Sequence, residues 1–257
     1  MSREKSGLMI TVDLELEVGK LCGADNERLD AATAGLIALC EKHELPATWA
    51  VADPARSAAT ESIRQTWQGH ELAIVGDRTW IGLGAGRLRF SRELARRVGA
   101  ARHAGLKVTS LVTRQAIVAN HLDLLVRHGI TAVAPLAGSM GAGAAQALRY
   151  GVWEVAFTNR LPIIAPWWQL AGSELELHHR LALAAGNGRT IHLAITAAQL
   201  LETGIEGLEM LDRAFAQIAL WRSEGKIGVE TLRPHVERIL SRRIKARSSC
   251  SILRAAA

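Results

Sequence analysis

The chain has 257 residues, 49% of them apolar and 22% charged, which is ordinary for a soluble globular protein with a large core. It shows no secretory signal and no apolar run of membrane-spanning length, so the sequence indicates neither a secreted nor a membrane-spanning protein. The three cysteines, Cys22, Cys40 and Cys250, have no disulfide-like or metal-like spacing, and we expect reduced thiols in the cytoplasm.

The positive charge is concentrated at the C-terminus. The whole chain has 31 basic and 25 acidic residues, a net charge of +6, but residues 242–257 hold five basic residues and no acid, which leaves +1 for the rest. We expect residues 242–257 to be a flexible basic tail. It is either a solvated terminus or a contact for an anionic partner such as acidic lipid, nucleic acid or another protein.

Short apolar strands alternate with amphipathic helices in the first half of the chain. The segment "LMITVD" is rich in residues that favour strands, and the helix at 91–105 begins at a Ser and ends at a Gly. We predict strands at 8–13, 46–51, 71–76, 107–113 and 130–135, and helices at 27–43, 56–68, 91–105 and 118–129.

The second half is less regular. The Gly- and Ala-rich segment 137–146 predicts a loop, and prolines interrupt the segment 161–170. The periodicity predicts strands at 151–157, 189–195 and 226–232, and helices at 173–185, 205–224 and 233–243.

This alternation predicts an α/β protein with a mostly parallel sheet, in a single domain over residues 1–241. A closed or nearly closed barrel and an open doubly wound sheet both fit the pattern. The sequence has neither a G-x-G-x-x-G motif after its first strand nor a P-loop, so no motif supports nucleotide binding.

Polar residues follow several of the predicted strands. Asp13 and Glu15 are two residues apart and share one side of an extended chain, where they could bind a cation or act as a base. Arg114 follows another strand and could orient a carboxylate or an anionic substrate. His192, within "TIHLAI", is a candidate acid or ligand, although a lone His on an apolar strand is more often structural.

Several segments together resemble the polysaccharide deacetylase (NodB-homology) family over residues 7–240. "ITVDLELE" is similar to the opening motif with its strand-end Asp, "LPATWAV" to the second strand, and "GHELAIVGDRTW" to the G-H-E segment. "TSLVTRQ" resembles the Arg motif, and the family's late His motif corresponds to residues near 192–197, with Thr196 and Ala197 where one variant has His-Pro.

The resemblance implies an irregular (β/α)7-type barrel and the removal of acetyl groups from sugars with the help of a divalent metal. It implies that Asp13 is the general base and His192 the acid, and that Glu15, Asp77, Trp80 and Arg114 contact an N-acetylated glycan. Trp167 and Trp168 are further candidates for stacking on a sugar.

The residues that correspond to the family's two metal-binding histidines are Val75 and Thr79. We therefore expect no metal and no other cofactor, and we expect a non-catalytic barrel that binds a carbohydrate or protein partner. The alternative is an active carbohydrate deacetylase or C–N hydrolase with an oxygen-ligand site at Asp13, Glu15 and Asp77, which would favour Mg²⁺ or Mn²⁺. A third possibility is a purely structural or regulatory protein that acts through residues 242–257.

Overall fold

The computed structural model describes residues 6–15, 23–55, 58–65, 69–82, 84–115, 117, 119–136, 145–160, 179, 182–183 and 190–255. The strands are β1 (Ser6–Asp13), β2 (Thr48–Val51), β3 (Glu71–Gly76), β4 (Ser110–Thr113), β5 (Ala132–Pro135), β6 (Ala145–Ala147), β7 (Trp153–Val155), β8 (Asn159–Arg160), β9 (Thr190–Thr196) and β10 (Ile227–Val229). The helices are α1 (Gly23–Lys42), α2 (Ala58–Gln65), α3 (Arg87–His103), α4 (Leu122–Arg127), α6 (Ala197–Ser223) and α7 (Leu232–Ala255), with short 3₁₀ turns η1 (Ala119–His121) and η2 (Arg149–Gly151).

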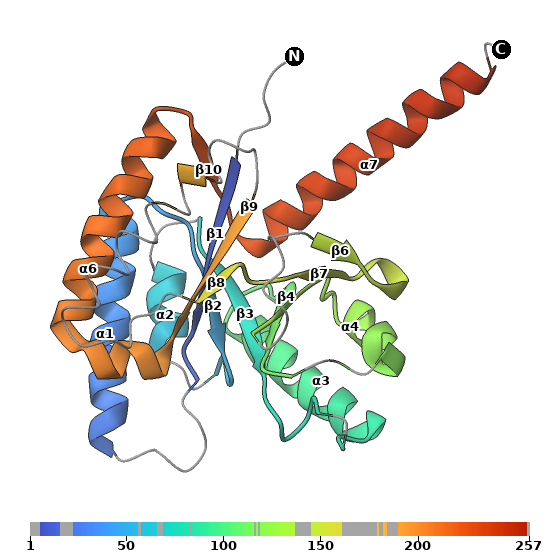
Figure 1. Cartoon of the computed structure of the whole chain (residues 1–257). Coiled ribbons are helices and arrows are strands. Elements are labelled where there is room, and N and C mark those ends of the chain that lie inside the picture. Colours follow the sequence, from blue (N-terminus) through green and yellow to red (C-terminus); the bar gives the residue numbers. More distant parts are fainter. Residues whose placement is uncertain are drawn as a thin grey trace.

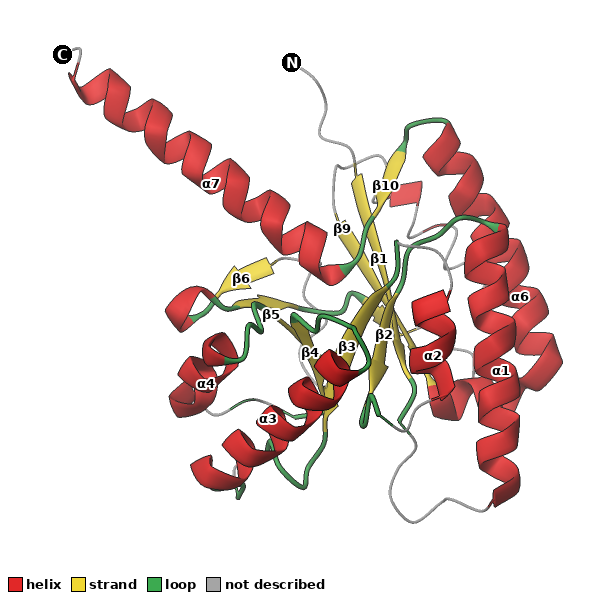
Figure 2. Cartoon of the chain, turned by 180° about the vertical axis from the view of Figure 1, so that it is seen from behind, coloured by secondary structure: helices red, strands yellow, loops and turns green. Residues whose placement is uncertain are grey.

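The strands form one curled sheet in the order β6-β7-β5-β4-β3-β2-β1-β9-β8, with β10 also paired to β1. The pairings are parallel except for β6 with β7. From β1 to β5 the order follows the chain without the reversal that a doubly wound sheet requires. The sheet is therefore a half-barrel with helices on its outer side, as Figures 1 and 2 show, and the predicted α/β barrel is confirmed.

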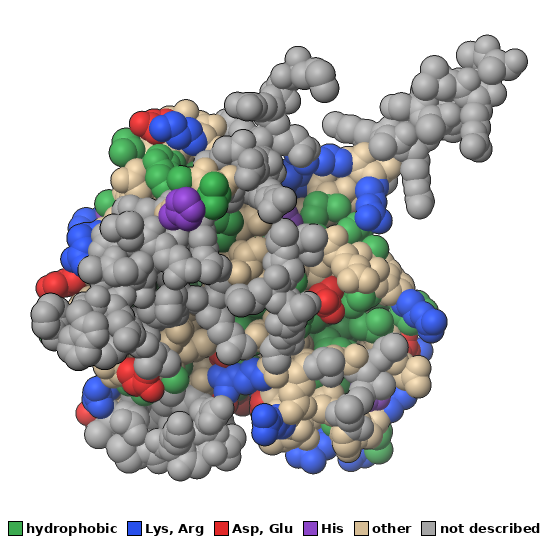
Figure 3. Space-filling view, viewed as in Figure 1, with side chains coloured by type: hydrophobic (Ala, Val, Ile, Leu, Met, Phe, Trp, Pro, Cys, Tyr) green, Lys and Arg blue, Asp and Glu red, His purple; other side chains and the backbone are tan. Residues whose placement is uncertain are grey.

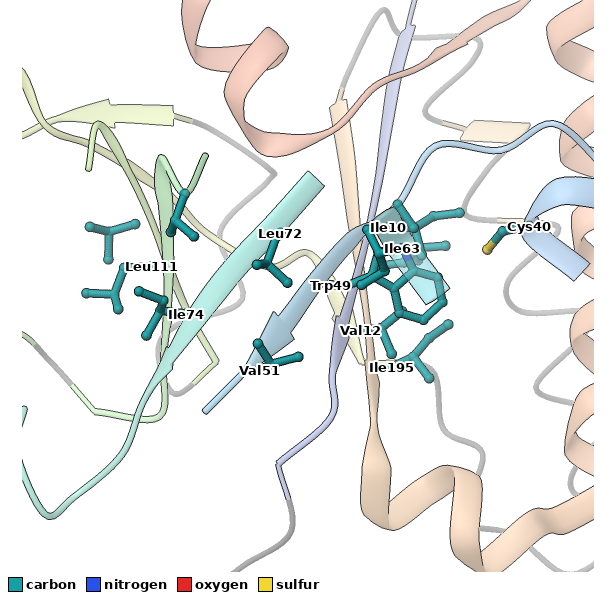
Figure 4. Packing of buried hydrophobic residues seen from close by; sticks show 14 of the residues in the cluster. Ile10, Val12, Cys40, Trp49, Val51, Ile63, Leu72, Ile74, Leu111 and Ile195 are labelled. Carbon is teal, nitrogen blue, oxygen red and sulfur yellow. The ribbon is translucent and has the colours of Figure 1, made fainter. Parts of the chain in front are cut away.

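Strand alternation divides β1 between two cores. Leu8, Ile10 and Val12 face the helices, in a large apolar cluster that also contains Trp49 and Ile74 (Figure 4). The alternate residue Met9 belongs to a second cluster on the concave face. That face is lined mainly by small side chains, Ala50, Ala73, Val75, Val112, Ala132, Ala134 and Ala194. Because Asp13 lies an even number of residues beyond Met9, it too is directed to the concave side of the sheet.

Helix α7 begins at the opposite end of the sheet from Asp13. Its residues Leu232 and Val236 are buried in the concave cluster. The Leu232 N–H donates to Thr48 Oγ1 at 3.3 Å, and the Arg233 N–H donates to the buried carboxylate of Glu71 at 2.9 Å. Side chains from β2 and β3 thus bind the N–H groups that the first turn of a helix leaves unpaired. The helix then extends away from the half-barrel (Figure 1).

The predicted strands and helices on described residues are present, with shifted ends. The helix predicted at 205–224 is present, and a short helical segment that Thr196 and Gln199 cap precedes it from Ala197, separated from it by a kink at Gly204, where φ is 52°. The backbone of residues 242–255 continues helix α7. Residues 137–144 and most of the helix predicted at 173–185 lie outside the described residues, as do Trp167 and Trp168. In the part of the chain that is described, no helix combines the length and apolar character needed to cross a membrane.

Candidate functional site

Asp13 and Arg114 meet where β1 and β4 end. Arg114 Nε and Nη2 donate to Asp13 Oδ2 at 2.9 and 2.8 Å, and the Glu15 N–H donates to Asp13 Oδ1 at 3.0 Å. Only 1% of the Asp13 side chain is exposed, and this burial raises the pKa of Asp13, although Arg114 acts in the opposite direction. The chain thus keeps a buried carboxylate at the strand ends with a guanidinium as its counterion.

Glu15 lies beside this pair, and no side chain of the described residues forms an ion pair with its carboxylate. Arg114 Nη2 donates to the main-chain oxygen of Glu15, not to its carboxylate. Partial burial, followed by the negative charge of Asp13, raises the pKa of Glu15 to about 6, while Arg114 and Arg97 oppose the shift. Glu15 therefore changes its charge close to neutral pH.

Asp77 follows β3 and shapes a tight turn. Its Oδ1 accepts hydrogen bonds from the Thr79 N–H at 2.7 Å and from Thr79 Oγ1 at 2.5 Å. Its Oδ2 lies 3.8 Å from Arg97 Nη2. Arg97 is 8% exposed, and its Nη1 also donates to the main-chain oxygen of Ala52. Arg97 therefore contributes a second buried cation to the strand ends.

The sequence analysis did not identify Arg97. The signal is its spacing, because Phe90, Leu94, Arg97 and Ala101 recur along one face of α3 and all of them are buried. An Arg in such a series of apolar residues indicates a guanidinium directed into the protein. The other arginines near it in α3 obscure this signal.

Trp80 was expected to contact a ligand, but the structure buries it completely. Its ring lies 5.5 Å from that of Phe90, and the Arg97 guanidinium lies 5.0 Å from its centre. Trp80 has no exposed face on which a sugar could stack. Its position instead supports Arg97 through a cation–π contact.

The five charged residues Asp13, Glu15, Asp77, Arg97 and Arg114 together form what we call the strand-end site. They come from the ends of β1, β3 and β4 and from α3. On the face shown in Figure 3, basic and acidic side chains adjoin one another at the lower centre, below the strand ends of Figure 1. In an α/β barrel, this end of the sheet is where ligands bind.

The two positions expected to replace metal-binding histidines do not supply metal ligands. Val75 is fully buried on the concave face and has no donor atom. The Thr79 hydroxyl is bound to Asp77. The described residues contain no group of three or more His, Cys, Asp or Glu side chains arranged to hold a metal ion. The donor set present here therefore does not fit the metal site of one carboxylate and two imidazoles that the resemblance implies.

His192 does not join the strand-end site. It pairs in register with Met9, whereas Thr196 pairs with Asp13, so His192 lies four residues, or about 13 Å, from the strand end. The ring is fully buried, stacks on Phe157 at 3.9 Å and hydrogen bonds to Thr11 Oγ1 at 2.8 Å. Burial lowers the pKa of His192 to about 3, so the ring is neutral near pH 7. These contacts place His192 away from the strand-end site, and its role as a catalytic acid stays a prediction.

The residue that the register places beside Asp13 is Thr196. Its hydroxyl caps α6, because it accepts a hydrogen bond from the Gln199 N–H at 3.4 Å. The late motif of the resemblance therefore brings a helix cap, and no imidazole, to the end of β9.

No protein-family model matches the sequence, and no curated protein sequence is significantly similar to it. Solved structures are similar in fold. A protein from Mycobacterium smegmatis that is assigned to the polysaccharide deacetylases has a TM-score of 0.74 at 15% identity, over 94% of this chain and 92% of that one. The allantoinase PuuE has a TM-score of 0.65 at 12% identity, over 92% and 90%.

The structures of a pseudoenzyme of the CE4 family are also similar. BA3943 from Bacillus anthracis has a TM-score of 0.52 at 11% identity, over 91% of this chain and 66% of that one. A mutant of BA3943 with restored enzymatic activity has a TM-score of 0.57 at 10% identity, over 91% and 68%. These low identities establish a shared fold and no more.

Proposed function

The chain has a divergent fold of the polysaccharide deacetylase type, and we propose that it binds a carbohydrate or protein ligand at the strand-end site without metal-assisted deacetylation. One observation carries this proposal. At the two positions where the resemblance expects imidazoles, Val75 is a buried apolar residue and the Thr79 hydroxyl is bound to Asp77. Metal-assisted hydrolysis needs an ion that polarises the carbonyl and activates water, and this donor set does not provide its ligands.

The charged groups that remain suit recognition. Arg97 and Arg114 are held by ion pairs and main-chain hydrogen bonds, so their side chains are already ordered before a ligand arrives. A preorganised site loses little conformational entropy on binding. The BA3943 structures support the proposal, because the same fold there belongs to a pseudoenzyme.

A second candidate is a hydrolase that acts on C–N bonds with altered chemistry. The observation that favours it is Glu15, whose pKa of about 6 suits a group that exchanges protons near neutral pH. The allantoinase PuuE shows that the fold is not confined to enzymes of acetylated sugars.

Two measurements on the purified chain separate these candidates. Elemental analysis is compared between the parent chain and an Asp13→Asn variant, and acetate release is followed with the acetylated chitin tetramer. The proposal predicts that the purified parent chain contains no metal ion whose binding requires Asp13. It also predicts that the parent chain releases no acetate above a blank without protein. The matched control is Glu237→Gln, which removes a carboxylate from an exposed ion pair with Arg233 at the opposite end of the sheet. A stoichiometric metal that Asp13→Asn removes and Glu237→Gln retains, or acetate release lost in the same way, would overturn the proposal.

A further inference from the structure

Glu15 is the one carboxylate of the strand-end site that no described side chain neutralises. Arg114 contacts the Asp13 carboxylate through two nitrogens, and Arg97 approaches Asp77. The contacts of Glu15 within the described residues involve only its main chain, through its N–H and its carbonyl oxygen. With Glu15 ionised, the site holds three carboxylates and two guanidinium groups, and so has a net charge of −1.

We propose that the strand-end site takes a ligand bearing a protonated amine, which pairs with the carboxylate of Glu15. An ammonium group brings one positive charge and three N–H donors, which matches a single unpaired carboxylate. A divalent cation matches less well, because it needs several oxygen ligands and the other two carboxylates already have arginine partners. This inference rests on the proposed function, and it specifies a glycan that carries free amines in place of N-acetyl groups.

The environment of Glu15 strengthens the preference for a cation. Burial is the main cause of the raised pKa of Glu15, and Asp13 and Asp77 add a negative potential at its carboxylate, which Arg114 and Arg97 oppose. A neutral acetamide gains nothing from this potential. An ammonium group gains a charge-assisted hydrogen bond, and it does so only while Glu15 is ionised.

The test is calorimetric titration of the full chain with two probes, the glucosamine tetramer and the N-acetylglucosamine tetramer. At pH 7 we expect the amine form to bind about tenfold more tightly, because its ammonium group gains a charge-assisted hydrogen bond that the acetamide lacks. Glu15→Gln keeps the shape of the side chain and removes its charge, so it should abolish the preference. Glu237→Gln is the matched control and should leave the preference intact.

A pH series provides a second readout that a merely structural role of Glu15 would not change. Because the pKa of Glu15 is about 6, lowering the pH from 7 to 5 should weaken binding of the amine tetramer about tenfold in the parent chain relative to Glu15→Gln, since the sugar amines titrate in the same way in both experiments. Equal binding of both tetramers, or a preference that survives Glu15→Gln, overturns the inference and leaves the proposed function in place. Binding of neither tetramer overturns the inference together with the carbohydrate form of the proposed function.

Discussion

Arg114 binds Asp13 through two guanidinium nitrogens that converge on one carboxylate oxygen, Oδ2, across 101 residues of sequence. Asp13 is buried, whereas about a quarter of the Arg114 side chain is exposed. The charge of the Asp13 carboxylate is therefore compensated mainly by Arg114, whereas the charge of Arg114 is also solvated by water. This asymmetry determines what substitutions at the strand-end site should do.

Arg114→Met should destabilise the fold by about 3 kcal/mol at pH 8, because it leaves a buried carboxylate without its counterion. The loss should shrink as the pH falls from 8 to 5, because burial raises the pKa of Asp13 and the variant removes the Arg114 charge that lowers it. Adding Asp13→Asn to Arg114→Met should recover part of the stability, because the uncompensated charge is gone. Urea unfolding of the two single variants and the double variant measures this coupling. Losses that simply add, at both pH values, would mean that the ion pair has no energetic role.

The raised pKa of Glu15 predicts that this group makes the fold less stable as the pH rises. The folded state keeps the Glu15 proton up to about pH 6, whereas the unfolded chain releases it near 4.5. Between these values the folded state binds more protons, so the free energy of unfolding decreases with increasing pH. After allowance for partial solvent exposure, the effect is about 1 kcal/mol.

The difference in the free energy of unfolding between Glu15→Gln and the parent chain should therefore grow in favour of the variant from pH 4.5 to pH 6 and stay constant above. His192 contributes in the opposite direction below pH 6.5, because its pKa is lowered in the folded state, but its effect cancels in this comparison. A difference that does not change with pH would show that Glu15 titrates normally.

Gly76 should tolerate no larger residue. A Cβ atom at this position would lie 1.7 Å from Ile81 Cδ1, and Ile81 is fully buried under the turn that Asp77 begins. Gly76→Ala should cost about 1–3 kcal/mol of stability through overpacking. Gly99→Ala, within α3, has nothing within 4 Å of its added methyl group and should stabilise the chain by about 0.5–1 kcal/mol. Thermal unfolding of both variants tests the pair, and similar shifts in the melting temperature would contradict the packing seen here.

Deleting residues 242–257 should leave the half-barrel folded and remove its affinity for anionic polymers. The residues of α7 that are described as buried, Leu232, His235 and Val236, precede this segment, and one described contact within it is Arg243 over the Trp153 ring, at 4.5 Å. Such a contact is worth about 0.5–1 kcal/mol when exposed. Salt-dependent retention on immobilised heparin is the measurement. A Lys107→Gln variant, which removes an exposed cation elsewhere, is the control, and unchanged retention after the deletion would assign the affinity to the body of the protein.

Much of the fold could be predicted because its signals are local. Apolar runs and their spacing identified the parallel strands, and the rule that parallel strands end on one edge brought Asp13 and Arg114 together. The position of His192 relative to Asp13 could not be predicted from its strand alone. Strand β9 is seven residues long, and its alternation repeats every two residues, so the pattern does not show which residue lies at the level of Asp13. The register with β1 shows that this residue is Thr196 and not His192. The burial of Trp80 depends on how α3 packs against the turn after β3, which no local pattern encodes. Arg97 has a signal in its helical spacing, but the neighbouring arginines of α3 obscure it.

The hydrogen bonds of the first turn of α7 to Thr48 and Glu71 have a consequence for biosynthesis. Helix α7 covers the concave core, and it follows the residues that receive it, Thr48 and Glu71, by 184 and 162 residues of sequence. A nascent chain must therefore keep its early strands assembled, with their apolar concave surface uncovered, until α7 has left the ribosome. Chaperone dependence of the newborn polypeptide should accordingly concentrate on that interval.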